Sequence, residues 1–121
     1  MANSKKYYRI KADRLFQNWF TKENPYCEMC GQPSVCGHHF HTKGNSSRLR
    51  YEPENMIPVC SSCHLSFHSK RSAEIISRLV VKRGLEWVNH LLEMKRDMSI
   101  KTNTIGYYKE IINKYKQNEH I

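Results

Sequence analysis

Two Cys-x-x-Cys pairs constrain this chain more than any other feature of its sequence. Cys27 and Cys30 form the first pair, Cys60 and Cys63 form the second, and 29 residues separate them. Four thiolates presented from two tight turns are the ligand set of a tetrahedral structural zinc ion. The spacer is longer than in a compact zinc ribbon, so further structure is expected between the pairs. Cys36 is left over, and we expect it to be a packed free thiol.

The composition favours a small, basic, globular protein. The 121 residues predict one domain, and 20 Lys and Arg against 11 Asp and Glu give a net charge of +9. An excess of this size favours a polyanionic partner, of which nucleic acid is the commonest. No run of about 18 apolar residues is present, which predicts no membrane span. The basic N-terminal stretch is not followed by an apolar one, so we expect no secretory signal and a cytoplasmic location.

Apolar periodicity predicts a mostly helical α+β fold. Helices are expected at 8–22, from the second cysteine pair to about 70, and at 72–83, 85–97 and 104–118. Extended segments are expected at 35–41 and 51–59, joined by a polar loop over 42–50. The organisation is an N-terminal helix within 1–25, a core over 26–70 and a C-terminal helical arm over 71–121.

Five of the seven histidines fall within one 31-residue stretch. On a helix, His64 and His68 would stand one turn apart on one face, as a bidentate clamp for a divalent cation. His38 and His39 are neighbours on a predicted strand and point to opposite faces. One of them can join the metal, and the other can act as a base. A metalloprotease would need Glu directly after the first histidine of the helix, and Leu stands there.

Two other zinc arrangements fit the same residues. His64 and His68 could join the second cysteine pair in another structural site. Alternatively, His38 and His41 could join the first pair in a small finger. Either arrangement would give a basic zinc-binding protein without a catalytic site.

From residue 27 to residue 68 the chain resembles the HNH (ββα-metal) endonuclease motif. The elements are a cysteine knuckle, a His-His pair, Asn55, and Cys-x-x-Cys-His with a further ligand position. The resemblance implies that His39 is the general base and that Asn55 ties the two strands together and keeps that base aimed. It implies a structural zinc on the four paired cysteines. It also implies one catalytic divalent ion (Mg²⁺, Mn²⁺, Ni²⁺ or Zn²⁺) held by His38, His64 and His68.

The chain is also similar to the phage lambda NinG (Rap) recombination endonuclease family. The matching order is His39-Phe40, Lys43-Gly44-Asn45, Leu49-Arg50-Tyr51, Asn55 and Cys60–Cys63. Members of that family often have Asn after the second knuckle, where this chain has His64. This resemblance implies a metal-dependent endonuclease for branched or recombination-intermediate DNA, in a phage or prophage role inside a bacterial cell, with a homodimer as one form. A packaging or restriction type of HNH nuclease and a non-catalytic zinc-knuckle DNA-binding module are the alternatives.

Five basic residues flank the expected site. Three lie on the polar loop and two follow the short helix: Lys43, Arg48, Arg50, Lys70 and Arg71. We expect these side chains to contact phosphates, which position a nucleic acid without reading its sequence.

Overall fold

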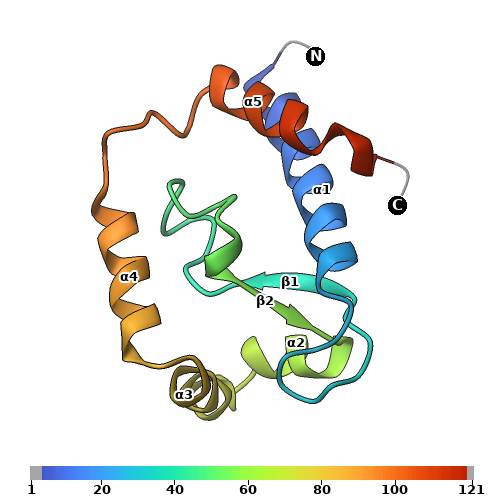
Figure 1. The fold of residues 1–121 in the computed structure, drawn as a ribbon, viewed down its shortest axis with the longest axis vertical. Helices are drawn as coiled ribbons and strands as arrows, with labels where there is room; N and C mark the ends of the chain where they lie inside the picture. Colours follow the sequence, from blue (N-terminus) through green and yellow to red (C-terminus); the bar gives the residue numbers. More distant parts are fainter. Residues whose placement is uncertain (1–3, 120–121) are drawn as a thin grey trace.

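The computed structural model describes residues 4–119, which form a mostly helical α+β fold, as predicted (Figure 1). The predicted segments 1–25 and 71–121 include residues 1–3 and 120–121, which lie outside the described part. The elements in chain order are α1 (Lys5–Glu23), β1 (Cys36–His39), β2 (Met56–Val59), α2 (Ser61–Phe67), α3 (Ser72–Arg83), α4 (Leu85–Arg96) and α5 (Ile105–Tyr115). Two 3-10 turns lie at Pro53–Asn55 and Lys116–Asn118.

Local capping explains where the helices begin and end. The N-cap Ser4 accepts a hydrogen bond from the Tyr7 amide at 3.1 Å, so α1 begins three residues earlier than predicted. Gly84, at φ +92°, adopts a conformation that side chains disfavour, and it separates α3 from α4. Thr104 caps α5 in the same way as Ser4 caps α1. The predicted extended segment 51–59 is wrong in its first half, because Pro53 begins a 3-10 turn there.

The sheet is a two-stranded antiparallel pair that depends on α1. Gly37 lies opposite Pro58, and both backbone polar groups of Gly37 face away from β2. Gln17 of α1 binds them: its side-chain Nε2 donates to the Gly37 carbonyl and its Oε1 accepts from the Gly37 amide, both at 2.9 Å. A Cβ on Gly37 would lie 2.7 Å from the Phe20 ring, so any larger residue would force the ring or the strand to shift. Gly37 and Pro58 form a non-hydrogen-bonded pair of the antiparallel ladder, so the lack of an N–H on Pro58 removes no hydrogen bond between the strands.

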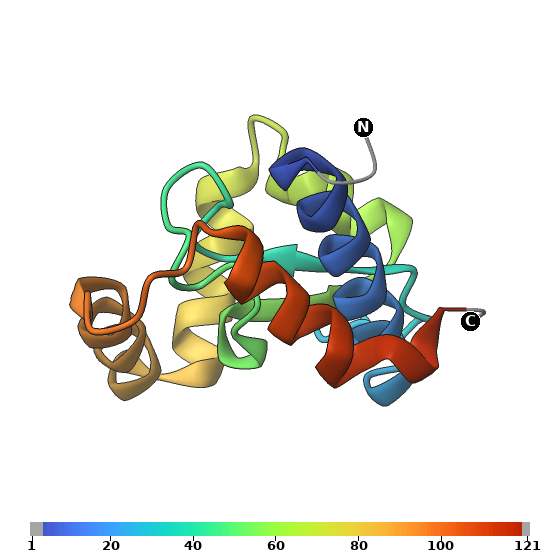
Figure 2. The same ribbon diagram turned by 90° about the horizontal axis from the view of Figure 1, so that it is seen from above.

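Two apolar clusters lie on either side of the sheet. The first joins α1 and α5 with Tyr51 and Met56, and it is rich in aromatic rings such as Phe16 and Tyr108. The second joins the first cysteine knuckle, β2, α2 and α3, around Ile57 and Leu79. Figures 1 and 2 show α1 and α5 side by side, with α3 and α4 on the other side of the hairpin.

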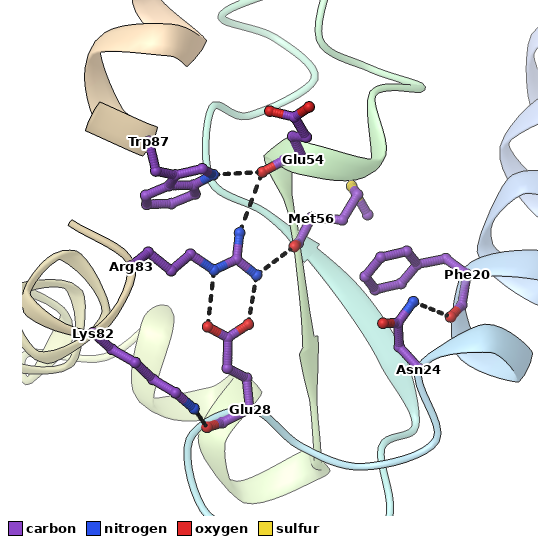
Figure 3. A network of polar contacts seen from close by, with 8 residues as sticks. All are labelled: Phe20, Asn24, Glu28, Glu54, Met56, Lys82, Arg83 and Trp87. Atoms are coloured by element: carbon purple, nitrogen blue, oxygen red, sulfur yellow. Dashed lines mark hydrogen bonds and ion pairs between the residues drawn. The ribbon is translucent and has the colours of Figure 1, made fainter. Parts of the chain in front are cut away.

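One arginine fastens the helical arm to the core (Figure 3). Arg83, at the end of α3, makes a bidentate ion pair with Glu28 of the first cysteine knuckle. It also donates to the Met56 carbonyl at 2.9 Å and lies over the Trp87 ring, 4.6 Å from its centroid. The Trp87 Nε1 donates to the Glu54 carbonyl at 2.8 Å. The start of β2, the knuckle and the arm therefore share one polar network.

Within residues 4–119 there is no helix with the length and apolar character that a membrane span requires.

Candidate metal centres and active site

The four paired cysteines converge in space. Their Sγ atoms lie within 4.8 Å of one another, so they could hold a structural metal such as zinc. Cys27 and Cys30 lie on a turn closed by the Gly31 amide, which donates to the Cys27 carbonyl, and Gly31 has φ +80°. Cys60 is the N-cap of α2. The site thus joins the first knuckle to the start of α2.

Backbone amides help the cysteine site to carry negative charge. Burial alone would raise the pKa of the Cys27 thiol, but hydrogen bonds from the backbone at Cys60, Cys30 and Met29 bring it down to about 7. The Cys63 amide also donates to the Cys60 sulfur at 3.4 Å. Thiolates are the form that binds zinc. The lowered pKa favours that form at Cys27, whereas burial and the neighbouring cysteine side chains raise the pKa of Cys63, and the pKa of Cys30 is raised as well.

Three histidines form a second group. His38 comes from β1, while His64 and His68 come from successive turns at the end of α2, and one nitrogen of each lies within 4.8 Å of the others. The Nε2 atoms of His64 and His68 are 3.2 Å apart. The His38 ring stacks on Phe67 with centroids 4.5 Å apart, which fixes its direction. In the described structure His64 and His68 are grouped with His38 and not with Cys60 and Cys63, and His41 belongs to neither group, so the two groups match neither alternative zinc arrangement.

The environment of His38 keeps it neutral. Burial, followed by the neighbouring His64 and His68, lowers the pKa of His38 to about 4. A neutral imidazole is the form that binds a metal. On the far side of His64, the Cys36 sulfur lies 3.5 Å from Nδ1, which leaves Nε2 to face His68. Cys36 is a free, half-buried thiol, as predicted.

His39 is held apart from this group by a different contact. Its Nε2 lies 2.9 Å from the backbone carbonyl oxygen of Arg50. A carbonyl only accepts hydrogen bonds, so Nε2 carries the proton and Nδ1 keeps its lone pair. Burial lowers the pKa of His39, and the hydrogen bond to Arg50 opposes that shift. The geometry therefore presents a neutral imidazole whose basic nitrogen is Nδ1.

Asn55 closes the loop that follows His39. The side chain is fully buried, and its Oδ1 accepts from the His41 amide at 2.8 Å. Its Nδ2 donates to the carbonyls of His41 and Leu49 at 3.0 and 3.2 Å. Both ends of the polar loop 42–50 are thereby tied to the residue that precedes β2.

Both histidine groups open onto one cavity of about 330 Å³. Gln17, Thr42 and Lys43 also line it. Of the five residues predicted to contact phosphate, Lys43 lines this cavity, and Lys70 and Arg71 are exposed two and three residues after His68 in the chain.

The other two predicted phosphate contacts are engaged elsewhere. The Arg48 guanidinium lies 3.6 Å from the Asp97 carboxylate, in a separate groove between the loop and the α4–α5 connector. The Arg50 guanidinium makes a bidentate ion pair with Asp13 and is 14% exposed. In this structure the Arg50 guanidinium is therefore engaged inside the protein, and its contact with phosphate stays a prediction.

Sequence reasoning missed two residues of α1 that border the site, Asp13 and Gln17. They lie four residues apart, so they share the face of α1 that carries Phe16 and Phe20. Polar side chains on an otherwise apolar stripe were the available signal, but nothing local tells which partners they meet.

Comparisons with known proteins find matches over part of this chain. Among curated proteins, the mitochondrial DNA mismatch repair protein mutS homolog of Sarcophyton glaucum is 39% identical over 49 residues. That match covers 37% of this chain and 5% of the relative, so the chain spans only a small part of that protein. No solved structure matches the chain. The family model for HNH endonuclease matches residues 27–70, the segment that contains both groups of side chains that could hold a metal.

Proposed function

We propose that this protein is a metal-dependent DNA endonuclease that hydrolyses phosphodiester bonds. One observation carries the proposal: His39 keeps a free Nδ1 lone pair beside a three-histidine group, on one cavity of a basic protein. A base, a cation site and a polyanion-binding surface are the three components that phosphodiester hydrolysis needs. The match of residues 27–70 to the HNH endonuclease family supports the same chemistry.

His39 is the general base of this proposal. The Nδ1 atom of His39 takes a proton from the attacking water, which makes the ring an imidazolium. The Arg50 carbonyl stabilises this cation by accepting the hydrogen bond from Nε2. The lowered pKa keeps the ring unprotonated, and therefore able to accept, at neutral pH. Asn55 holds the loop that carries the Arg50 carbonyl, which keeps the base aimed. Cleavage leaves a 3′ hydroxyl and a 5′ phosphate.

His38, His64 and His68 would hold the catalytic ion. When bound, it supplies charge neutralisation at the phosphoryl group and at the leaving oxygen. Three imidazoles and no carboxylate form a donor set that suits Zn²⁺ or Ni²⁺ better than Mg²⁺. The four paired cysteines hold a structural zinc, whose binding energy stabilises the fold.

Lys43, Lys70 and Arg71 are the phosphate contacts of the proposal. Each is exposed near the histidine cavity. Contacts of this kind set the position of the duplex and make affinity depend on salt.

Branched or recombination-intermediate DNA is the substrate class that we propose, on the resemblance to the NinG (Rap) family. Enzymes that cut such junctions symmetrically often work as pairs, so we propose a homodimer on DNA as one form of the active enzyme. A general packaging or restriction type of HNH nuclease is the alternative within the same chemistry. The mismatch-repair name of the curated relative adds support for DNA as the partner.

A nicking assay tests the proposal. Zinc-loaded protein, cleared of loosely bound metal with a mild chelator, is mixed with supercoiled plasmid and Mg²⁺, Mn²⁺, Ni²⁺ or Zn²⁺ in turn. Cleavage that requires added metal and is lost in His39→Ala supports a nuclease. DNA binding without cleavage under every metal would indicate a non-catalytic module instead. A panel of linear, flapped and four-way DNA then separates a junction enzyme from a general one.

A further inference from the structure

The carboxylate of Asp13 binds the side chains on both sides of one peptide group. Arg50 donates from Nε to Oδ1 at 2.8 Å and from Nη2 to Oδ2 at 2.6 Å. The Tyr51 hydroxyl donates to Oδ1 at 2.7 Å. The peptide group that joins residues 50 and 51 is therefore attached to α1 at two points.

The same peptide group carries the oxygen that binds His39. The Arg50 carbonyl accepts the hydrogen bond from His39 Nε2 at 2.9 Å. Residues 48–51 form turns outside the two-stranded sheet, so no strand ladder fixes the direction of this carbonyl. Asn55 binds the preceding carbonyl of Leu49, and the contacts of Asp13 with both flanking side chains add a constraint on the Arg50–Tyr51 peptide group itself.

The contact is shielded from water. The side chains of Arg50 and Asp13 are 14% and 24% exposed, and Tyr51 is buried. A small cavity of about 20 Å³ is lined by Asp13, Gln17 and His39 among others, so α1 borders the imidazole. In such surroundings a bidentate ion pair is stronger and more rigid than one on the surface.

We infer that Asp13 is a positioning residue for His39, acting through the Arg50–Tyr51 peptide group. Asp13 lies outside residues 27–70, so this role is not part of the segment that matches the HNH family. The effect on cleavage rests on the function proposed above. The effect on the state of the imidazole does not, because it follows from the contacts alone.

The direct test is the tautomer of His39. Long-range ¹H–¹⁵N spectra of the zinc-loaded full chain, at a pH where the ring is neutral, distinguish a proton on Nε2 from one on Nδ1. Wild type should show the Nε2–H form. In Asp13→Ala the ratio of the two forms should fall about fivefold, which corresponds to one ordinary hydrogen bond. Arg14→Ala is the matched control, since Arg14 makes an exposed ion pair with Glu119 from the same helix.

Cleavage kinetics give the second readout. In Asp13→Ala, kcat should fall by roughly five- to fiftyfold, while KM for DNA and the affinity for the catalytic ion stay within about twofold. Asp13→Glu should restore part of kcat, because it keeps the charge. Adding Arg50→Ala to Asp13→Ala should cost little more, since both act through one contact.

The outcomes separate this inference from the proposed function. A changed tautomer ratio with no metal-dependent cleavage in wild type would uphold the role of Asp13 and overturn the nuclease. Cleavage in wild type with an unchanged tautomer in Asp13→Ala would overturn the role of Asp13. If Asp13→Ala does not fold, the isosteric Asp13→Asn gives the same readout, and an unchanged tautomer there would refute the inference.

Discussion

Gly37→Ala should destabilise this protein more than any other glycine-to-alanine change with a negative φ. The added Cβ would lie 2.8 Å from the Met56 Cε and 2.7 and 3.0 Å from two ring carbons of Phe20. The methionine methyl is the end of a flexible side chain and can move. The Phe20 ring is buried and lies against the rings of Phe16 and Trp19, so it has no free direction.

The expected cost is that of overpacking a core, about 1–3 kcal/mol of unfolding free energy. The strand must also shift away from α1, which stretches the two hydrogen bonds between Gln17 and Gly37. For a domain of this size, that cost lowers Tm by roughly 3–15 °C. Because His38 follows directly in β1, the affinity for the catalytic ion should fall as well.

Thermal and urea unfolding of the zinc-loaded protein measures the loss. Gly44→Ala is the matched control, because nothing lies within 4 Å of its added Cβ and Gly44 is on an exposed loop. It should change the unfolding free energy by no more than about 0.5 kcal/mol. Phe20→Leu should recover part of the stability of Gly37→Ala by giving the methyl group room. An unfolding free energy for Gly37→Ala equal to that of wild type would refute the close approach of α1 to β1.

Three further predictions concern the metal sites and DNA. His39→Ala should still bind the catalytic ion and DNA, but its cleavage rate should fall by roughly 10²–10⁴-fold, with partial rescue at high pH. His64→Ala should instead bind the metal more weakly and recover part of its activity when metal is added. Nicking rates and metal titrations check both variants. Cys60→Ser should lower zinc content and unfold the chain at a lower temperature, and a stable, zinc-free variant would contradict the structural site. DNA affinity, measured in anisotropy titrations, should fall steeply as the salt concentration rises. A flat plot of log affinity against log salt concentration would contradict the proposed phosphate contacts.

The sequence predicted those features that depend on local pattern. Cysteine spacing and the H-x3-H repeat each bring two ligands together within one turn or one helix, so each pair could be anticipated from local pattern. The joining of the two cysteine pairs, and the addition of His38 to His64 and His68, was predicted from the residue types that a metal site needs and from the family resemblance. The helices were also predicted, because apolar periodicity and caps are local signals. The extended segment from Tyr51 was wrong because Pro53 fits the first turn of a 3-10 helix as well as it fits a strand.

Contacts between distant segments could not be predicted in the same way. Arg50 was expected to meet phosphate because a basic residue on a polar loop usually faces solvent. The sequence contains no sign that Asp13, 37 residues earlier, meets it instead. The ion pair between Arg83 and Glu28 joins residues that are 55 positions apart, and nothing in the sequence predicts it either. Such pairs follow from how the helices are placed around the sheet, which only the folded structure reveals.

The dependence of β1 on α1 limits how far the motif can be transplanted. If residues 27–70 were grafted into another protein, the strand that carries His38 and His39 would lose the Gln17 amide from its open edge. Gly37 would then expose a bare stretch of backbone in place of the contact with Phe20. A host must therefore offer its own helix at this position, with an amide side chain and an aromatic ring three residues apart. A graft of this motif should therefore include α1 together with residues 27–70.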